Sequence, residues 1–340
     1  MPAARFRHLA CTAFDAIYII GGRDLTDAIQ TDVFVFNTTT RAWSTLPGAY
    51  PIDPVNGLGS DNSCSSVGDT IYVFGGYTQF YEVSVNRVWA FKPARGGAGT
   101  WTRSRANLTT GRGDFASVEL GGSIYVYGGY TTSFNNSNNW ACNPLTSMEV
   151  YSPASDSFTP GTPLPAALAE KDDGVVVGGR MFSIGGERKA KAIGCKDPDI
   201  VPLTEVFSYD AVTRTWANET SMPDARMRFA SAVVGGTIIV FGGQGAVSGT
   251  TIPLLYSAFK YVVPPVAPAE PVTVPYASFA GAVAGTAITA FALAAAVYAM
   301  RKCWKRAAAR KLLAAAAKAP AEAEGAAAEA RKPLAAAASV

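Results

Sequence analysis

The chain has 340 residues, of which 49% are hydrophobic and 33 are glycine, so it is long enough to bury a large core and is rich in turn-forming residues. Its single histidine excludes a metal centre with two imidazole ligands and gives little basis for a Ser-His-Asp hydrolase. Basic residues are concentrated in residues 301–340, beside an apolar segment, while the rest is mildly acidic, which argues against a nucleic-acid binder.

One pattern recurs five times in the first 262 residues. A mostly apolar run of four residues is followed at once by Gly-Gly, and the glycine pairs start at residues 21, 75, 128, 185 and 242. Downstream of the first four pairs comes a strand that ends in an aromatic, then a turn and a second aromatic. Four short strands per repeat are typical of a propeller blade, so we expect an all-β propeller. The aromatic pairs are Phe36 with Trp43, Phe91 with Trp101, Tyr151 with Phe158, and Tyr209 with Trp216.

Three segments carry a family resemblance: YDAVTRTW (residues 209–216), MPDARMRF (222–229) and VVGGTIIVFGG (233–243). Together they resemble the Kelch repeat of galactose oxidase and attractin-like propellers, and the resemblance covers residues 1–262. It implies five visible four-stranded blades. The fifth repeat stops after a third strand, and MPAAR at the start of the chain resembles MPDAR of the fifth repeat, which follows a fourth strand. We therefore expect an incomplete last blade, closed by an N-terminal strand from upstream of Met1.

The C-terminal part has a different character. Residues 263–275 are rich in proline and predict a semi-rigid stalk. Residues 276–300 carry no charge over a length that can span a bilayer, which predicts one transmembrane helix. Residues 301–340 combine a basic juxtamembrane segment with an Ala-rich tail that we expect to be largely disordered.

The basic segment predicts the topology of this single-pass protein. Arginine and lysine flanking a membrane helix favour the cytoplasmic side, so the propeller is expected to be extracellular or lumenal. Gly281 and Gly285 have the spacing of a helix-dimer face and predict a weak homodimer. One signal disagrees, because residues 1–22 are not a secretory signal peptide. The same missing upstream segment would supply one; otherwise the chain is a cytosolic adaptor tethered to the membrane.

Two further features bear on the side of the membrane. Cys142 and Cys195 lie in equivalent loops of successive repeats and are a candidate disulfide if the domain is outside the cytosol. Cys11 and Cys64 lie in the first strands of repeats one and two, where we expect two buried thiols because inner strands are usually too far apart for bridging. Candidate glycosylation sites are the sequons at Asn37, Asn107, Asn135 and Asn218.

The candidate binding face combines two sets of residues. The connection into each first strand and the loop after each Gly-Gly emerge on the same face of an antiparallel blade. Arginine and aromatic side chains are favoured at interface hot spots, and long loops on a rigid scaffold commonly bind partners. The alternative is that the arginines brace the blades and the tyrosines cover their own loops. The candidates are Arg5, Arg112, Arg226, Tyr77, Tyr81, Tyr130, Trp140 and Arg188.

These observations predict a non-catalytic, membrane-anchored recognition module for a protein or glycan, with no catalytic residue, metal or cofactor. No closely spaced set of histidine and carboxylates suggests a metal, and the Gly-Gly pairs end strands rather than open helices, so they are not phosphate loops. The enzyme alternative is a sugar epimerase or mutarotase similar to the Kelch-type sialic acid epimerases.

Overall fold

The computed structural model describes residues 1–263, apart from residues 48, 53–58, 79–82, 95–96, 136–138, 171–173, 190–199 and 247–251. All described strands belong to one compact unit, residues 1–266. Most of the predicted stalk, the predicted membrane helix with Gly281 and Gly285, and the tail lie outside the described residues. Within the described part, no helix has the length and apolar character needed to cross a membrane.

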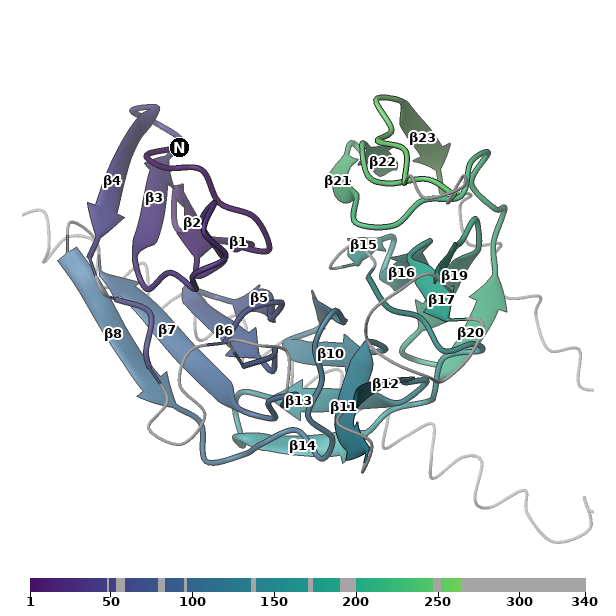
Figure 1. Ribbon diagram of the computed structural model, residues 1–340, viewed down its shortest axis with the longest axis horizontal. Coiled ribbons are helices and arrows are strands. Elements are labelled where there is room, and N and C mark those ends of the chain that lie inside the picture. Colours follow the sequence, from purple (N-terminus) through teal and green to yellow (C-terminus); the bar gives the residue numbers. More distant parts are fainter. Residues whose placement is uncertain are drawn as a thin grey trace, which may run out of the picture. The chain divides into compact units, whose positions relative to one another are not determined.

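The described strands form five antiparallel blades, as predicted (Figure 1). Each complete blade has four strands in chain order from the inside outward, and the fifth blade has three described strands. Two small hairpins interrupt blades three and four. Blade one is β1 (Leu9–Ala13), β2 (Ala16–Ile20), β3 (Val33–Asn37) and β4 (Ala42–Leu46); blade two is β5 (Ser63–Val67), β6 (Thr70–Phe74), β7 (Val88–Ala94) and β8 (Gly97–Arg103); blade three is β9 (Ala116–Leu120), β10 (Ser123–Tyr127), β13 (Met148–Ser152) and β14 (Ser157–Pro160); blade four is β15 (Val175–Val177), β16 (Arg180–Ile184), β19 (Val206–Asp210) and β20 (Thr215–Asn218); blade five is β21 (Ala230–Val234), β22 (Thr237–Phe241) and β23 (Ala258–Val262); the hairpins are β11 (Tyr130–Asn135) with β12 (Asn139–Pro144), and β17 (Glu187–Lys189) with β18 (Ile200–Pro202).

The aromatic pairs seen in the sequence lie opposite each other on the third and fourth strands. Phe36 of β3 faces Trp43 of β4, and Tyr209 of β19 faces Trp216 of β20. Their ring centroids are 5.0 Å and 4.9 Å apart, the separation at which offset aromatic pairs are attractive. These pairs set the register of the outer strands, because a shift by one residue would move each ring to the other face.

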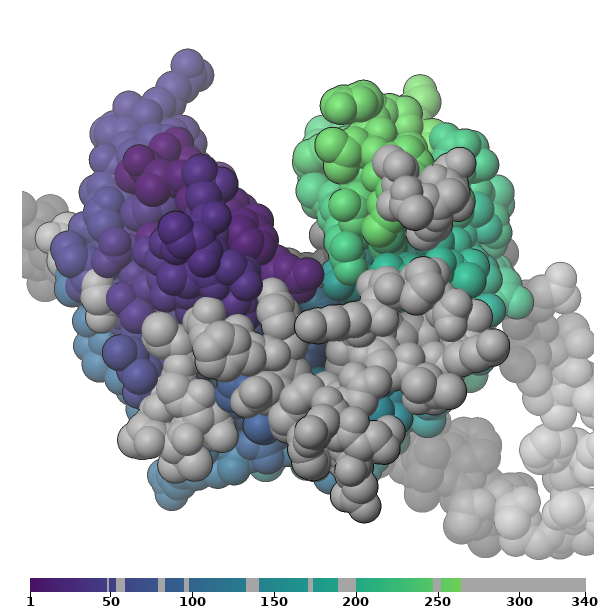
Figure 2. All heavy atoms as spheres, in the orientation of Figure 1, coloured from purple at the N-terminus to yellow at the C-terminus, as the bar shows by residue number. Residues whose placement is uncertain are grey.

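The core lies between neighbouring blades. Tyr18 and Ile20 of blade one pack in one buried cluster with Val73 and Phe91 of blade two. The innermost strands follow one another in space, since β1 contacts β5, β5 contacts β9, β9 contacts β15 and β15 contacts β21. Figure 2 shows neighbouring blades in close contact, while the first blade (purple) and the last (green) stand apart.

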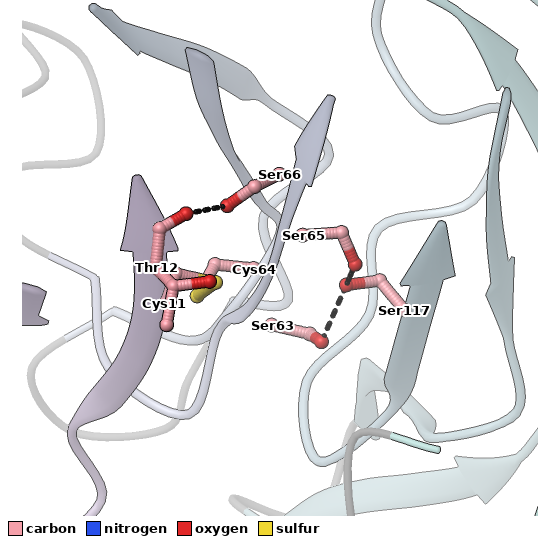
Figure 3. The surroundings of a disulfide bond; sticks show 7 residues. All are labelled: Cys11, Thr12, Ser63, Cys64, Ser65, Ser66 and Ser117. Atoms are coloured by element: carbon pink, nitrogen blue, oxygen red, sulfur yellow. Dashed lines mark hydrogen bonds between the residues drawn. A yellow bond between two sulfur atoms is a disulfide. The ribbon is translucent and has the colours of Figure 1, made fainter. Parts of the chain in front are cut away.

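The prediction for the first two cysteines was wrong, because Cys11 and Cys64 form a disulfide between β1 and β5 (Figure 3). Their Cα atoms are 6.3 Å apart, within the range that bridging requires. Cys11 lies opposite Tyr18 and Cys64 opposite Val73, one position earlier in its own blade. The two cysteines thus differ by one position when the blades are aligned. Adjacent inner strands approach each other with this same shift of one residue, so the two sulfur atoms can meet.

The equivalent contact between blades two and three is made by serine hydroxyls instead of a disulfide. Ser65 lies opposite Tyr72, as Cys11 lies opposite Tyr18, and its hydroxyl is 3.0 Å from that of Ser117 on β9. Ser117 also hydrogen-bonds Ser63, as Figure 3 shows. The inner-strand contact is therefore a property of the repeat, and the cysteines make it covalent at one blade boundary.

The combination Ser65→Cys with Ser117→Cys should produce a second interblade disulfide under oxidising conditions. The expected gain in free energy of unfolding is about 2–4 kcal/mol, because the bond restricts the unfolded chain over a loop of similar length to that closed by Cys11 and Cys64. Non-reducing peptide mapping and urea unfolding measure both effects. Recovery of two free thiols in the folded variant would contradict the shared offset.

Candidate binding site on the entry-ring face

In each described blade, a turn leads into the innermost strand. One residue of that turn has a left-handed backbone conformation. This conformation favours glycine and costs other residues on the order of 1 kcal/mol or more. Here all five positions carry a charged side chain. We call them the entry ring: Arg7 (φ 54°), Asp61 (φ 56°), Asp114 (φ 55°), Glu170 (φ 46°) and Arg228 (φ 52°). Charged residues also take this conformation in the outer turns, at Arg41, Asp156 and Arg214, so the conformation itself belongs to the repeat. The entry ring differs in that its members contact one another across blades.

Backbone hydrogen bonds hold the entry ring against the loop that follows each Gly-Gly. In blade three, Tyr130 follows the glycine pair, donates its N–H to the Gly113 carbonyl (2.9 Å) and accepts the Gly113 N–H (3.0 Å). The same two-way pairing joins Phe6 to Arg23, Ser60 to Tyr77, Ala169 to Glu187, and Met227 to Gln244. The entry turns and the post-glycine loops therefore share one face, as expected from strand direction.

The ring positions of successive blades are also joined directly. The backbone N–H of Asp114 donates to the Asp61 carbonyl (3.2 Å), that of Glu170 to the Asp114 carbonyl (3.0 Å), and that of Arg228 to the Glu170 carbonyl (2.9 Å). These bonds cross from one blade to the next, so they position the charged side chains relative to one another with little freedom.

The side chains of the entry ring form two arginine-centred groups. Arg7 hydrogen-bonds Asp61 and has Nη1 3.7 Å from Oδ1 of Asp114. Arg228 has Nη2 2.7 Å from Oε1 of Glu170 and 3.8 Å from Oε2 of the buried Glu187. Buried Arg23, which has in blade one the position of Glu187 in blade four, reaches Asp61 through the Ser60 hydroxyl. Among the described residues, these four carboxylates therefore have three arginines near them.

Burial, together with the neighbouring carboxylates, raises the pKa values of two ring carboxyls. Burial, followed by the neighbouring carboxylates of Glu170 and Asp61, raises the pKa of Asp114 well above its usual value, against the opposing effect of Arg7. Burial also raises the pKa of Asp61. Clusters of this kind are common at functional sites because a bound partner can relieve the repulsion.

Three predicted binding residues, Arg5, Arg112 and Arg226, are structural instead. The side chain of Arg5 is 2% exposed, and Arg112 and Arg226 are fully buried. Each guanidinium donates to the carbonyl of the first glycine of its own blade's pair, at 3.0, 3.0 and 2.7 Å respectively. Because these donors satisfy carbonyls inside the blade, they are not available to a partner. They brace their own blade, whereas the alternative expected from the sequence was that they brace neighbouring blades.

Two of the four predicted aromatics are also internal. Tyr77 and Tyr130 are each 2% exposed, and the Tyr130 hydroxyl donates to Oε1 of Glu187 (2.7 Å). Trp140 lies in β12 opposite Phe134, and Tyr81 lies outside the described residues. Arg188 is the exposed member of the set, with its side chain 44% exposed and Nη2 3.3 Å from Oε1 of Glu205.

The structure describes the four sequon asparagines and one of the two cysteines of the predicted disulfide. Asn37, Asn107 and Asn218 are exposed, and Asn135 ends β11. Cys142 is in a disulfide, but its predicted partner Cys195 lies outside the described residues, so that pairing stays a prediction.

The entry ring is absent from the predicted binding residues, although the sequence holds its signal. In repeats one, three and five, the ring residue stands two places after the arginine of the motif. Repeats two and four lack that arginine, so the motif does not locate Asp61 or Glu170. Arg7, Asp61, Asp114 and Arg228 each stand 14 residues before the first glycine of their pair, whereas Glu170 stands 15 residues before Gly185, so alignment on the glycine pairs finds four of the five ring residues.

Comparisons with known proteins agree with this architecture. Residues 61–251 match the model of the KLHDC2/KLHL20/DRC7 Kelch-repeats domain, and residues 4–48 match the Kelch motif. The chain therefore belongs to the Kelch-repeat family, whose propellers generally bind protein partners. The solved structure titled "Structure of YjhT" has a TM-score of 0.54 at 17% identity, covers 72% of this chain and 74% of that one, and supports the fold alone.

Two kinds of curated relative are similar over most of the propeller. Kelch domain-containing protein 3 of Bos taurus is 24% identical over 255 residues, which are 72% of this chain and 62% of that protein. The chain thus spans less than two thirds of that relative. The N-(sulfonatooxy)prop-2-enimidothioate sulfolyase of Thlaspi arvense is 28% identical over 269 residues, or 72% of this chain and 71% of the enzyme.

The substitution Asp114→Asn should stabilise the protein at neutral pH. A carboxyl whose pKa is raised on folding favours the folded state while it is protonated, and this stability is lost as pH rises from the unfolded pKa, about 3.9, through the folded pKa. Asparagine keeps the shape without the charge, so thermal unfolding at pH 7 should occur a few degrees higher than in the wild type.

The matched control is Asp69→Asn, at an exposed turn between β5 and β6, which should leave unfolding unchanged. The stability of Asp114→Asn should also depend less on pH between 4 and 7 than that of the wild type. A lower unfolding temperature for Asp114→Asn at pH 7 would mean that the ionised carboxylate stabilises the fold.

Proposed function

We propose that this protein is a non-catalytic recognition module, anchored by residues 276–300, whose entry-ring face binds a protein partner outside the cytosol. The observation that carries the proposal is the entry ring itself, where interblade hydrogen bonds and ion pairs bring charged side chains from all five described blades together on one face.

The charge of the ring supports a basic partner. Carboxylates outnumber the ring arginines, and Asp114 shares its arginine with Asp61. A lysine or arginine side chain from a partner would supply the missing positive charge in a partly desolvated setting, where such pairs are strong. A glycan offers hydroxyl groups but no cation, so it fits the ring less well.

An enzyme remains the alternative function, because one similar protein is named as a sulfolyase. The buried ring carboxyls with raised pKa values are the groups that could serve as acids there. Turnover of a sugar or of a sulfated thioimidate by the purified chain would favour this alternative over the binding module.

Display outside the cytosol is supported by two observations. The Cys11–Cys64 disulfide joins two blades, and structural disulfides persist mainly in oxidising compartments. Three of the four sequon asparagines are exposed, as a glycosylated residue must be.

Removing two carboxylates tests the binding proposal. Asp114→Asn combined with Glu170→Gln should reduce capture of the partner at least tenfold, because truncating one member of a desolvated charge pair costs about 2–5 kcal/mol. Immobilised chains are incubated with membrane extracts of the native cell, and the captured proteins are quantified by mass spectrometry. The control Asp69→Asn should retain them. Equal enrichment on the double variant and the wild type would contradict a site at the entry ring.

Glycosylation tests the location. Digestion of the protein from its native cell with an N-glycanase should lower its apparent mass and convert at least one of Asn37, Asn107 and Asn218 to aspartate. The variant Thr220→Ala removes the sequon at Asn218 and should abolish conversion at that position alone. An unchanged mass, together with free Cys11 and Cys64 thiols in the cell, would favour the cytosolic adaptor.

A further inference from the structure

Each post-glycine loop places a second row of residues outside the entry ring. In every described blade, the residue after the glycine pair is bridged on one side to the residue that precedes the ring position. On its other side it is bridged to a residue further along its own loop. Neighbouring strands lie about 4.8 Å apart, so this outer row lies about 10 Å from the backbone beside the ring. The outer row is Ile29, Ser84, Pro144, Pro202 and Leu254.

Exposed apolar side chains lie at or near the outer row in four of the five described blades. In blades two and four an exposed valine directly precedes the outer-row residue. In blade five the outer-row residue is itself an exposed leucine, and in blade one an exposed leucine lies four residues before it. Scattered apolar residues are normal on a protein surface, whereas apolar residues gathered on one face mark interaction sites. We call this set the collar: Leu25, Val83, Val201 and Leu254.

The collar residue of blade one is presented by a loop with many internal hydrogen bonds. Leu25 itself is 87% exposed. The carboxylate of Asp24 accepts the N–H groups of Thr26 (2.8 Å) and Ala28 (3.2 Å). The fully buried Arg23 donates to a carbonyl of the same loop (3.0 Å). A loop that is already ordered loses little conformational entropy on binding, so Leu25 is suited to contact a partner.

The collar and the entry ring complement each other in a complex. In strong interfaces, the residues around the central contacts contribute by excluding water from them. A charge pair between a partner and a ring carboxylate such as Asp61 becomes stronger when water is excluded. Arginine and lysine carry an apolar stem, but one side chain cannot both enter the ring and cover a collar about 10 Å away. The neighbours of the basic residue must therefore cover the collar.

We propose that the partner inserts an arginine or lysine from the tip of a projecting loop into the entry ring, while apolar residues on both sides of it contact the collar. This inference rests on the function proposed above and adds the chemistry of the partner's sequence. A purely basic segment would leave the collar exposed to water. A purely apolar segment would remove water from the ring charges without replacing it.

A phage-displayed library of disulfide-closed peptides with random loops supplies the probes. The library is selected on the immobilised full chain, and the enriched peptides are synthesised for affinity measurements. They should contain an arginine or lysine with apolar residues directly beside it, because both parts of the site then gain a contact.

Matched variants separate the two parts of the site. Asp114→Asn with Glu170→Gln should abolish binding of the enriched peptides. Leu25→Ser with Val201→Ser should weaken it at least tenfold and make it more sensitive to salt, because water and ions then reach the charge pair. Val212→Ser, at a 94% exposed valine in the turn between β19 and β20, should leave binding unchanged. The three serine substitutions are at exposed positions, so the unfolding temperature should stay the same.

The outcomes distinguish this inference from the function on which it rests. Peptides that need the ring but bind the collar variant as tightly as the wild type would overturn the inference and leave the proposed function in place. Peptides that need the collar but bind the ring variant equally well would contradict the proposed function, and the inference with it. Enrichment of peptides without a basic residue, or of no peptide at all, would also overturn the inference.

Discussion

The close contact between each glycine pair and an entry turn is the constraint on which the rest of the structure depends. A Cβ atom on Gly129 would lie 2.5 Å from the Gly113 carbonyl oxygen and 2.5 Å from Cβ of Phe115, and one on Gly76 would lie 2.6 Å from the Ser60 carbonyl oxygen. Both glycines also have positive φ, at 83° and 96°. A side chain there would push the entry turn away and break the paired hydrogen bonds, so the motif that ends the second strand also fixes the ring residue.

The two sets of arginine near the entry turns differ in exposure. Arg112 is fully buried, and its donors reach three backbone carbonyls, the Ser147 hydroxyl and the Glu149 carboxylate, so its charge is well compensated. Arg228, in the equivalent turn of blade five but two residues later, is partly exposed and pairs with Glu170 of the neighbouring blade. Arginines that stabilise their own blade and arginines that join neighbouring blades are thus separated by two residues of sequence.

The sequence was sufficient for the repeat but not for the side-chain environment. Periodic Gly-Gly pairs and aromatic partners predicted the blades, the three-stranded last blade and the shared face of loops and entry turns, because these depend on backbone direction and strand alternation. Such a pattern does not determine which groups a long side chain contacts. Arg226 could have pointed outward, and only the structure shows that its donors reach Gly242 and Ser257.

The disulfide shows a second limit of the sequence. Whether Cys11 can reach Cys64 depends on how the inner strand of one blade is shifted along that of the next. Strand pairing within a single blade does not determine this shift. Equivalent contacts such as Ser65 with Ser117 are visible only once both inner strands are placed. Alignment of the repeats on their glycine pairs finds four of the five entry-ring residues and misses Glu170 by one position, whereas the interblade offset can be seen only in the structure.

Site-specific photo-cross-linking in the native cell tests the central claim, that the entry-ring face is the recognition surface, and it works whatever the partner is. A photoreactive amino acid at Arg188, which is exposed directly after Glu187, should cross-link the partner. The same group at Asp69, exposed in the turn between β5 and β6 at the other end of the strands, should not. Cross-links from Asp69 and none from Arg188 would contradict the account.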